Sequence, residues 1–252
     1  QLAKKEYDLS HFSVILSGGA ILTPALKDAL LEKIPHLMII DGFGASETGG
    51  HGTQISMAGA KATTGTFRMN DETTVLKDDL SGPLTPGAEE SGWLARRGHV
   101  PLGYFKDAAK TAQTFPVIDG VRYAVPGDHA KLAADGSIVV LGRGSVSINS
   151  GGEKIYPEEV EQALKHHPAV YDAVVVGTPN ERFGQQVTAV VQARAGEVPP
   201  AEELIGFCAA HLARYKLPRA IVFVDEMVRS PAGKADYRWA RKTALESLGG
   251  HA

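Results

Sequence analysis

The apolar positions near the start of the chain follow a strand–helix–strand pattern. FSVIL (12–16) and LMIID (37–41) are short apolar runs that predict two buried strands. Between them, PALKDALLEKI (24–34) repeats apolar residues at helical spacing. Thr23 and Pro24 favour a helix start, because the threonine hydroxyl can accept an unpaired amide and proline has no N–H to leave unpaired. These residues predict a βαβ unit.

From about residue 59 to 140 the pattern changes to short segments interrupted by glycine and proline. GPLTPGAEESGWLARRG (82–98) and VPLGYF (100–105) indicate turns between short strands. DHAKLAADGSIVVLGR (128–143) predicts a hairpin. This part of the chain is therefore expected to form a small β-rich subdomain.

The pattern after about residue 148 alternates strands and helices. SVSINSGGEKIYP (145–157) predicts a strand, a glycine turn and a second strand, and the next helix has Pro157 at its first position and ends before Pro168. The fold class expected for the whole chain is α/β plus α+β, with a compact α+β unit from 148 onward. Its further strands are expected at 172–177, 186–193 and 220–226, and its further helices at 201–215 and 237–248.

Composition and charge narrow the function classes. With 252 residues, 43% of them hydrophobic, the chain can bury a sizeable core. A formal net charge of -3 provides no general basic field for nucleic acid or an anionic membrane surface. Cys208 is alone and cannot form an internal disulfide, and no apolar run approaches the roughly 20 residues of a membrane span. We expect a cytoplasmic protein with no nucleic-acid partner and no membrane span.

The first residues carry neither a signal-peptide layout nor a convincing translation start. QLAKKEYDLSHF (1–12) lacks the charged and then apolar order of a secretory signal. We therefore expect the chain to begin inside a longer protein.

Two glycine-containing stretches near the N-terminus are candidate ligand sites. In SGGA (17–20), Gly18 and Gly19 would let the backbone approach a flat ligand closely, although a simple turn explains them equally well. The second stretch, DGFGASETGG (41–50), contains more chemistry, and its alternative interpretation is a glycine-rich loop with a capping glutamate. In it, Phe43 can stack on a base, Gly44 allows close approach, Ser46 offers a hydroxyl to phosphate and Glu47 is an oxygen ligand suited to Mg²⁺.

Charged residues near the predicted hairpin are candidates for a sugar site. Asp128 can accept hydrogen bonds from both hydroxyls of a ribose, and Arg143 presents a rigid fork of donors. Each residue is equally consistent with a surface charge or turn.

Two motifs lie in the C-terminal part. In SGGEKIYPEEVE (150–161), Gly151 and Gly152 would leave a narrow passage beside the backbone. SPAGKADY (230–237) places Lys234 on a Pro/Gly loop that can bring a compact positive charge to a site made elsewhere, although most loop lysines are only solvated.

The order and spacing of these motifs, together with LGR (141–143), resemble the adenylate-forming superfamily of acyl-CoA synthetases, luciferases and peptide-synthetase adenylation domains. The resemblance runs from about residue 12 to 240. The form of SGGEKIYPEEVE is most similar to the acyl-CoA ligases, and GWLARRGHVPLGYFKD (92–107) looks like ligases of bulky or long acyl chains, steroid side-chain acids among them.

The resemblance implies a domain organisation and a reaction. Residues 1–142 would be the C-terminal part of the large AMP-binding domain, 143–147 a hinge and 148–252 a small mobile domain. The implied function is activation of a carboxylic acid with ATP to an acyl-adenylate, followed by transfer to coenzyme A, within fatty acid and lipid metabolism. The implied cofactors are ATP/AMP, Mg²⁺ and coenzyme A.

The resemblance also assigns roles to residues. Lys234 and Glu47 would be catalytic, with Glu47 also holding Mg²⁺, and Gly151 and Gly152 would flank the path of the coenzyme A thiol. The nucleotide and its phosphate would be held by Gly18, Gly19, Ala20, Asp41, Phe43, Gly44, Ser46, Asp128 and Arg143.

The sequence departs from the superfamily pattern in two places. The phosphate-binding loop that precedes the FGASE-type motif is absent, and ATTGTF (62–67) resembles it only in composition, because it follows Glu47 and lacks the lysine. At the hinge, Ser145 replaces the usual acid or lysine. His51 is expected to line an acyl pocket and Cys208 to lie in a helix core.

These departures keep two other functions open. The chain can be a noncatalytic nucleotide-binding or interaction fragment, or part of an adenylating enzyme that loads a carrier-protein thiol. By itself it is expected to be inactive. The acyl substrate and the oligomeric state are not determined by these motifs.

Overall fold

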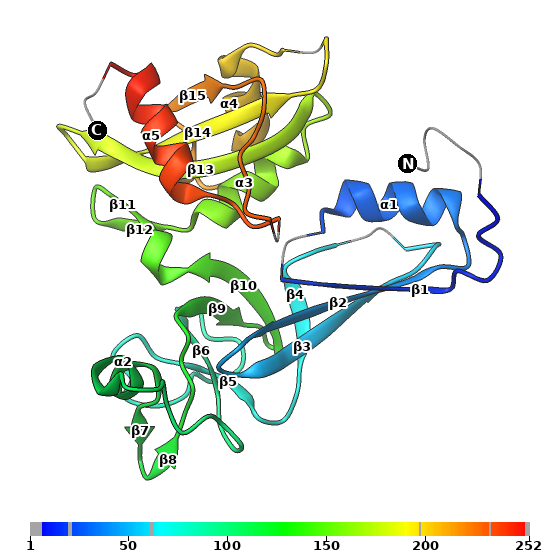
Figure 1. Cartoon of the computed structure of the whole chain (residues 1–252). Helices are drawn as coiled ribbons and strands as arrows, with labels where there is room; N and C mark the ends of the chain where they lie inside the picture. The colour runs from blue at the N-terminus through cyan, green and yellow to red at the C-terminus, as the bar shows by residue number, and fades with distance from the viewer. Residues whose placement is uncertain (1–6, 20–21, 61–62, 197, 232, 250–252) are drawn as a thin grey trace. The chain divides into compact units, whose positions relative to one another are not determined.

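The computed structural model describes residues 7–19, 22–60, 63–196, 198–231 and 233–249 (Figure 1). The chain divides into two compact units. The first comprises Gln1–Pro126 and Lys131–Val139, and the second comprises Gly127–Ala130 and Val140–Ala252. The division between the units therefore passes through the hairpin predicted at 128–143.

The first unit begins with the predicted βαβ arrangement. β1 (Val14–Gly18) and β2 (Met38–Ala45) pair in parallel, and α1 (Pro24–Lys33) connects them. The Thr23 hydroxyl accepts a hydrogen bond from the Leu26 amide at 3.4 Å, so the predicted helix start is confirmed. The helix and the strands enclose a core formed by Leu31, Ile34, Leu37 and Ile39.

The stretch DGFGASETGG forms most of a β-hairpin. Residues 41–45 continue β2, and β3 (Gly49–Ser56) runs antiparallel to it. Thr48 closes the connection, because its hydroxyl accepts from the Ala45 amide at 3.1 Å. The interpretation of this stretch as a loop is therefore wrong, and the backbone hydrogen bonding of two paired strands is the reason.

The remainder of the first unit is rich in short strands, as predicted. The main sheet has the order β1-β2-β3-β4-β10-β9-β6-β5, and β10 pairs with β4 through Ser137–Val139. The predicted hairpin at 128–143 is confirmed as β9 and β10. The elements in this region are β4 (Thr66–Met69), β5 (Thr73–Leu76), β6 (Ser91–Arg96), α2 (Ala108–Thr114), β7 (Val117–Ile118), β8 (Val121–Arg122), β9 (Asp128–Leu132) and β10 (Ser137–Arg143).

The second unit is a sheet with helices on both faces (Figure 1). Its strands have the order β12-β11-β14-β13, with β15 parallel to β14. The elements are η1 (Gly144–Val146), β11 (Ile148–Ser150), β12 (Glu153–Ile155), α3 (Pro157–Lys165), β13 (Val170–Asn180), β14 (Gly184–Ala193), α4 (Ala201–Ala209), η2 (Arg214–Lys216), β15 (Ala220–Phe223) and α5 (Tyr237–Ser247).

The continuous apolar run of β13 is explained by this two-sided burial. Ala173 and Val175 lie in the core with α3 and α4, while Val174 and Val176 lie in the core with α5. Successive side chains of a strand point to opposite faces, so a strand covered on both sides is apolar throughout. The α/β plus α+β fold class is therefore confirmed.

Two predicted elements are shorter than expected. The helix expected at 201–215 ends at Ala209, and the chain turns so that Leu212 and Leu217 both pack against the core. The strand expected at 220–226 ends at Phe223. The helical spacing of apolar residues in the sequence continues to residue 215. The helix nevertheless ends at Ala209, because the turn that follows brings both leucines into contact with the core.

Cys208 occupies the core position that was predicted. It is fully buried on α4, and burial raises the pKa of its thiol to about 11. Among the residues that the structure describes, no helix is long and apolar enough to cross a membrane.

Gly44 offers a test of the hairpin. A Cβ atom at this position would lie 2.1 Å from the carbonyl oxygen of Gly49, an overlap that no side-chain movement can relieve. We expect Gly44→Ala to lower the free energy of unfolding by about 1–3 kcal/mol in urea denaturation.

The matched control for this experiment is Gly50→Ala, because a Cβ at Gly50 meets nothing within 4 Å. We expect the control to change stability by less than about 0.5 kcal/mol. Equal effects of the two substitutions would show that the overlap at Gly44 is not what requires a glycine there.

Candidate functional site

The candidate residues for the adenine side lie at the ends of two paired strands. Gly18 at the end of β1 is opposite Gly42 in β2, next to Asp41 and Phe43. In parallel sheets ligands commonly bind beyond the carboxyl ends of the strands. A Cβ at Gly18 would lie 3.2 Å from the Gly42 carbonyl oxygen, whereas Gly19 has a φ of +77° and open space around its Cα.

Ala20, the next predicted residue, lies outside the described residues. The structure thus brings together Gly18, Gly19, Asp41 and Phe43 at one edge of the first unit.

Asp41 has a structural partner that the sequence did not reveal. Its carboxylate forms a buried ion pair with Lys27 of α1, and the Lys27 ammonium also donates to the Thr63 carbonyl at 2.6 Å. Lys27 is fully buried, so removal of Asp41 would leave a charge without its partner. In the sequence, the only sign of this ion pair is that Lys27 lies in the predicted helix 24–34 and Asp41 in the predicted strand 37–41.

Phe43 lies in an aromatic group that includes His51. The two rings are stacked with centroids 5.9 Å apart, and Phe67 lies 5.4 Å from Phe43. His51 is fully buried, and its Nδ1 lies 3.2 Å from the Thr73 hydroxyl. Burial and the nearby Arg96 charge lower the pKa of His51 to about 4, so this imidazole is neutral at pH 7.

Ser46 and Glu47 lie in the connection between β2 and β3. Ser46 is exposed, while the Glu47 carboxylate accepts a hydrogen bond from the Tyr104 hydroxyl at 2.6 Å. Burial, followed by the bond to Glu47, raises the pKa of Tyr104, so the hydroxyl remains a donor. Tyr104 is 57 residues away in the sequence, and no local pattern linked the two residues.

Glu47 has the chemistry of a magnesium ligand, because carboxylate oxygens suit Mg²⁺. Among the described residues no three His, Cys, Asp or Glu side chains form a group that could hold a metal ion.

Arg96 fixes the connection that carries Glu47. Its Nη1 donates to the carbonyls of Thr48 at 2.8 Å and Gly50 at 2.9 Å, and its Nη2 forms an ion pair with Glu72. The sequence analysis did not single out this arginine. Its guanidinium holds the backbone beside Glu47 in one conformation.

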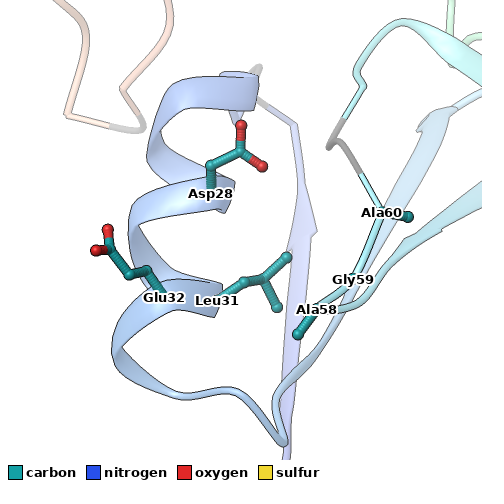
Figure 2. A pocket seen from close by; sticks show the side chains of 6 residues that line it. All are labelled: Asp28, Leu31, Glu32, Ala58, Gly59 and Ala60. Atoms are coloured by element: carbon teal, nitrogen blue, oxygen red, sulfur yellow. The ribbon is translucent and has the colours of Figure 1, made fainter.

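A shallow depression of about 210 Å³ lies between α1 and the segment Ala58–Ala60 (Figure 2). Leu31 points from the helix toward this segment, and Asp28 and Glu32 contribute two carboxylates. None of the predicted site residues lines it. Two carboxylates oppose binding of a phosphate group, so this depression is a poor candidate for a nucleotide site.

In the second unit the structure brings Asp128 and Arg143 together. The Arg143 Nε lies 3.4 Å from the Asp128 Oδ1, with Asp128 buried and the Arg143 side chain 57% exposed. The exposed guanidinium beside a buried carboxylate presents donors and acceptors at the same place. Such a pair can hold the hydroxyls of a sugar.

A second carboxylate contacts the backbone beside Arg143. Glu158 of α3 accepts a hydrogen bond from the Arg143 amide at 3.2 Å, and a Cβ at Gly142 would lie 2.1 Å from its other oxygen. Burial, followed by the charge of Glu161, raises the pKa of Glu158 to about 7. Glu161 is fully enclosed, accepts from the Val175 amide at 3.0 Å and is hydrogen bonded to Tyr237 of α5.

Gly151 and Gly152 form the turn between β11 and β12, with φ values of +62° and +89°. The Gly151 amide donates to the Phe183 carbonyl at 2.9 Å, and a Cβ at Gly151 would lie 3.1 Å from the Phe183 ring. A Cβ at Gly152 would meet nothing within 4 Å. Gly151 is therefore required by local packing, while Gly152 borders open space.

Lys234 lies on a closed loop of the second unit, and its side chain is exposed. The Ser230 amide donates to the Lys234 carbonyl at 2.9 Å, and the Lys234 amide donates to the Ser230 hydroxyl at 3.1 Å. The loop thus presents the lysine from a defined backbone conformation.

Comparison with protein families gives two matches. The model described as AMP-binding enzyme matches residues 1–105, and the AMP-binding enzyme C-terminal domain matches residues 159–234. The medium-chain acyl-CoA ligase Mig of Mycobacterium avium is 58% identical over 94% of this chain and 43% of its own length. The medium/long-chain-fatty-acid and 3-oxocholest-4-en-26-oate CoA ligase of Mycolicibacterium smegmatis is 53% identical over 97% of this chain and 44% of its own length.

Solved structures show the same architecture. ATP-bound MatB from Rhodopseudomonas palustris matches with a TM-score of 0.76 and 26% identity over 93% of this chain and 46% of that protein. The amide bond synthetase McbA from Marinactinospora thermotolerans matches with a TM-score of 0.82 and 27% identity over 93% and 47%. The chain spans less than half the length of these relatives.

The raised pKa of Glu158 predicts a pH-dependent stability. Because the folded chain holds this proton more tightly than the unfolded chain, the stability contributed by Glu158 is full below pH 4.5 and is lost as the pH rises through 7. Glu158→Gln removes the ionisation, so we expect it to raise the free energy of unfolding at pH 8 by on the order of 1–3 kcal/mol, with no gain at pH 4.5. Urea denaturation at both pH values measures this.

Glu153→Gln is the control, since it removes an exposed carboxylate from the neighbouring strand β12. A gain from Glu158→Gln that is the same at both pH values would contradict the assignment.

Proposed function

Because this chain belongs to the family of AMP-binding enzymes, we propose that it is the C-terminal portion of an acyl-CoA ligase that forms an acyl-adenylate from ATP and a carboxylic acid. The observation that carries the proposal is identity of 53–58% with acyl-CoA ligases along nearly the whole chain. The positions of the candidate residues support it. The activity requires the intact enzyme, of which this chain is a part.

The proposed substrates are medium or long fatty acids and acids with a bulky ring system. Two relatives are named for medium-chain acids or for medium- and long-chain fatty acids and 3-oxocholest-4-en-26-oate. We assign the enzyme to fatty acid and lipid metabolism in the cytoplasm, where ATP and coenzyme A are both available.

In the first half-reaction a carboxylate oxygen forms a bond to the α-phosphorus of ATP, and the bond to pyrophosphate breaks. Gly18, Gly19 and Phe43 would lie against the adenine, and Asp128 with Arg143 would hold the ribose. Mg²⁺, when bound, would neutralise phosphate charge beside Ser46 and Glu47. Lys234 would stabilise the negative charge that develops on the reacting oxygens.

Tyr104 and Arg96 have supporting roles in this proposal. Tyr104 fixes one oxygen of Glu47, and Arg96 holds the backbone that directly follows it, at Thr48 and Gly50. A carboxylate that is held in one orientation can bind a cation without first losing side-chain freedom.

In the second half-reaction the thiol of coenzyme A attacks the acyl carbonyl carbon, and AMP leaves. The small domain would rotate about residues 143–147, so that Lys234 withdraws and Gly151–Gly152 come to the path of the thiol. Open space at Gly152 supports this role, because a side chain there would occupy that path. A carrier-protein thiol in place of coenzyme A would be attacked at the same carbon, and thioester formation with each thiol distinguishes the two.

The isolated chain of 252 residues is expected to be inactive. It contains no phosphate-binding loop of the type that precedes the FGASE motif, and departure of pyrophosphate needs donors to its oxygens. We expect no acid-dependent ATP–pyrophosphate exchange above background. Exchange at a rate typical of enzymes would show that the chain itself carries a complete catalytic site.

In the intact enzyme, Lys234 and Gly152 are expected to act in different half-reactions. Lys234→Ala should slow adenylation about 10²–10³-fold, because it removes one preorganised charge, and should leave thioester formation from supplied acyl-adenylate nearly unchanged. Gly152→Leu should spare pyrophosphate exchange and block acyl transfer. Each half-reaction is measured separately.

Gly152→Ala is the matched control for Gly152→Leu. Both substitutions carry the same strain at a φ of +89°, so a difference between them reports side-chain bulk. If Lys234→Ala and Gly152→Leu slow the same half-reaction, the assignment of two successive sites is wrong.

A further inference from the structure

Arg229 connects the loop that carries Lys234 to the sheet of its unit. Arg229 and Ala235 form a β-bridge at the base of the loop. Within it, the Gly233 amide donates to the Ser230 carbonyl at 2.8 Å. These bonds tie Gly233 to Ser230 and Arg229 to Ala235, and the orientation of Lys234 on the domain depends on what holds this base.

Arg229 forms a planar fork between this loop and the sheet. Its Nε and Nη2 donate to the two carboxylate oxygens of Asp172 on β13 at 2.6 and 2.7 Å. Its remaining Nη1 donates to the carbonyl of Gly233 at 3.0 Å, one residue before Lys234. One rigid guanidinium therefore connects the backbone beside Lys234 to a strand of the central sheet.

Asp172 is itself held firmly. Its side chain is 13% exposed, Lys165 of α3 lies 3.1 Å from its Oδ1, and the same oxygen accepts from the Ala173 amide at 2.9 Å. Burial alone would raise the pKa of Asp172, but the bonds from Arg229 and Lys165 outweigh it and keep the pKa below its usual value. The carboxylate is thus an ionised and immobile acceptor for the arginine.

Lys165 and Arg229 share Asp172 and differ in one respect. Among the described residues of the loop, Gly233 accepts a hydrogen bond from the Arg229 Nη1, and none is bonded to Lys165. Substitution of either residue removes a cation from the same carboxylate. A comparison of the two variants therefore separates a general loss of stability from loss of the connection to Lys234.

We propose that Arg229, anchored by Asp172, is a positioning residue that sets where Lys234 is presented during adenylation. This inference rests on the proposed function, in which Lys234 acts in the first half-reaction only. A misplacement of about 1 Å in a catalytic group can cost roughly 10²-fold in rate. Loss of the fork releases the loop while Lys234 itself remains present.

The test is a double-mutant cycle in the intact enzyme. Arg229→Gln removes the fork and is expected to slow acid-dependent ATP–pyrophosphate exchange about 10-fold or more, through kcat. It is expected to change thioester formation from supplied acyl-adenylate by less than about two-fold. In the background of Lys234→Ala, Arg229→Gln is expected to produce no further loss, because its effect passes through that lysine.

Two further variants define the comparison. Lys165→Gln is the matched control, for which we expect an effect of less than about two-fold on either half-reaction. Arg229→Lys keeps the charge but cannot hold both Asp172 and the Gly233 carbonyl with a planar fork, so an intermediate loss is expected. Thermal unfolding of each variant confirms that it is folded at the assay temperature.

The outcomes distinguish this inference from the proposed function. If Lys234→Ala leaves pyrophosphate exchange unchanged, the proposed role of Lys234 is wrong, and positioning by Arg229 is wrong with it. If Lys234→Ala slows exchange but Arg229→Gln has no effect, only the positioning role is overturned. A loss from Arg229→Gln that adds to that of Lys234→Ala, or that Lys165→Gln matches, means that the ion pair serves stability alone.

Discussion

The cost of burying a charge determines how both units hold their candidate residues. An ionised side chain away from water is stable only when partners satisfy it, and removal of one partner leaves the other uncompensated. In the first unit the buried ammonium of Lys27 has Asp41 and a carbonyl as partners. In the second unit Asp172 is held between Arg229 and Lys165. Each pair joins separate elements, so the same contacts that satisfy the charges also fix the strands relative to the helices and loops.

Glycines in the candidate motifs have different physical reasons for being there. At Gly44 and Gly142 a side chain would collide with a neighbouring backbone or carboxylate, so the fold alone explains these residues. Gly19 and Gly152 have positive φ angles and open space around them. A glycine-rich motif therefore does not by itself identify a ligand contact. The positive φ angles alone favour glycine at Gly19 and Gly152, and the open space beside them leaves room for a ligand.

Local patterns predicted many of the elements, although not β3 or α2, because run length and periodicity are properties of neighbouring residues. The βαβ unit, the hairpin at 128–143 and the strands of the second unit were predicted in this way. The end of the helix at Ala209 was not, because Leu212 and Leu217 contact a core assembled from distant strands.

The candidate site, too, was predicted only in part, because some of its contacts join residues that are distant in the sequence. The motifs identified Glu47 and Lys234, and the order of the motifs gave their expected roles. Tyr104, which contacts Glu47, and Arg229, which contacts the backbone beside Lys234, were not identified, because Tyr104 lies 57 residues from Glu47 and Asp172 lies 57 residues from Arg229. The spacing of residues in the sequence does not distinguish a charged or hydroxyl side chain that makes such a contact from one that is only solvated.

The predicted hinge shows how a missing charge in a motif can be compensated by the fold. Ser145 cannot supply the charge that the superfamily pattern has at this position, and it lies in the short helix η1. The carboxylate that reaches this backbone is instead that of Glu158, which accepts from the Arg143 amide and leaves no room for a side chain at Gly142. Because the pKa of Glu158 is raised to about 7, its protonation changes near neutral pH. The carboxylate that contacts this backbone therefore comes from α3, outside the segment 143–147 that the sequence predicts as a hinge.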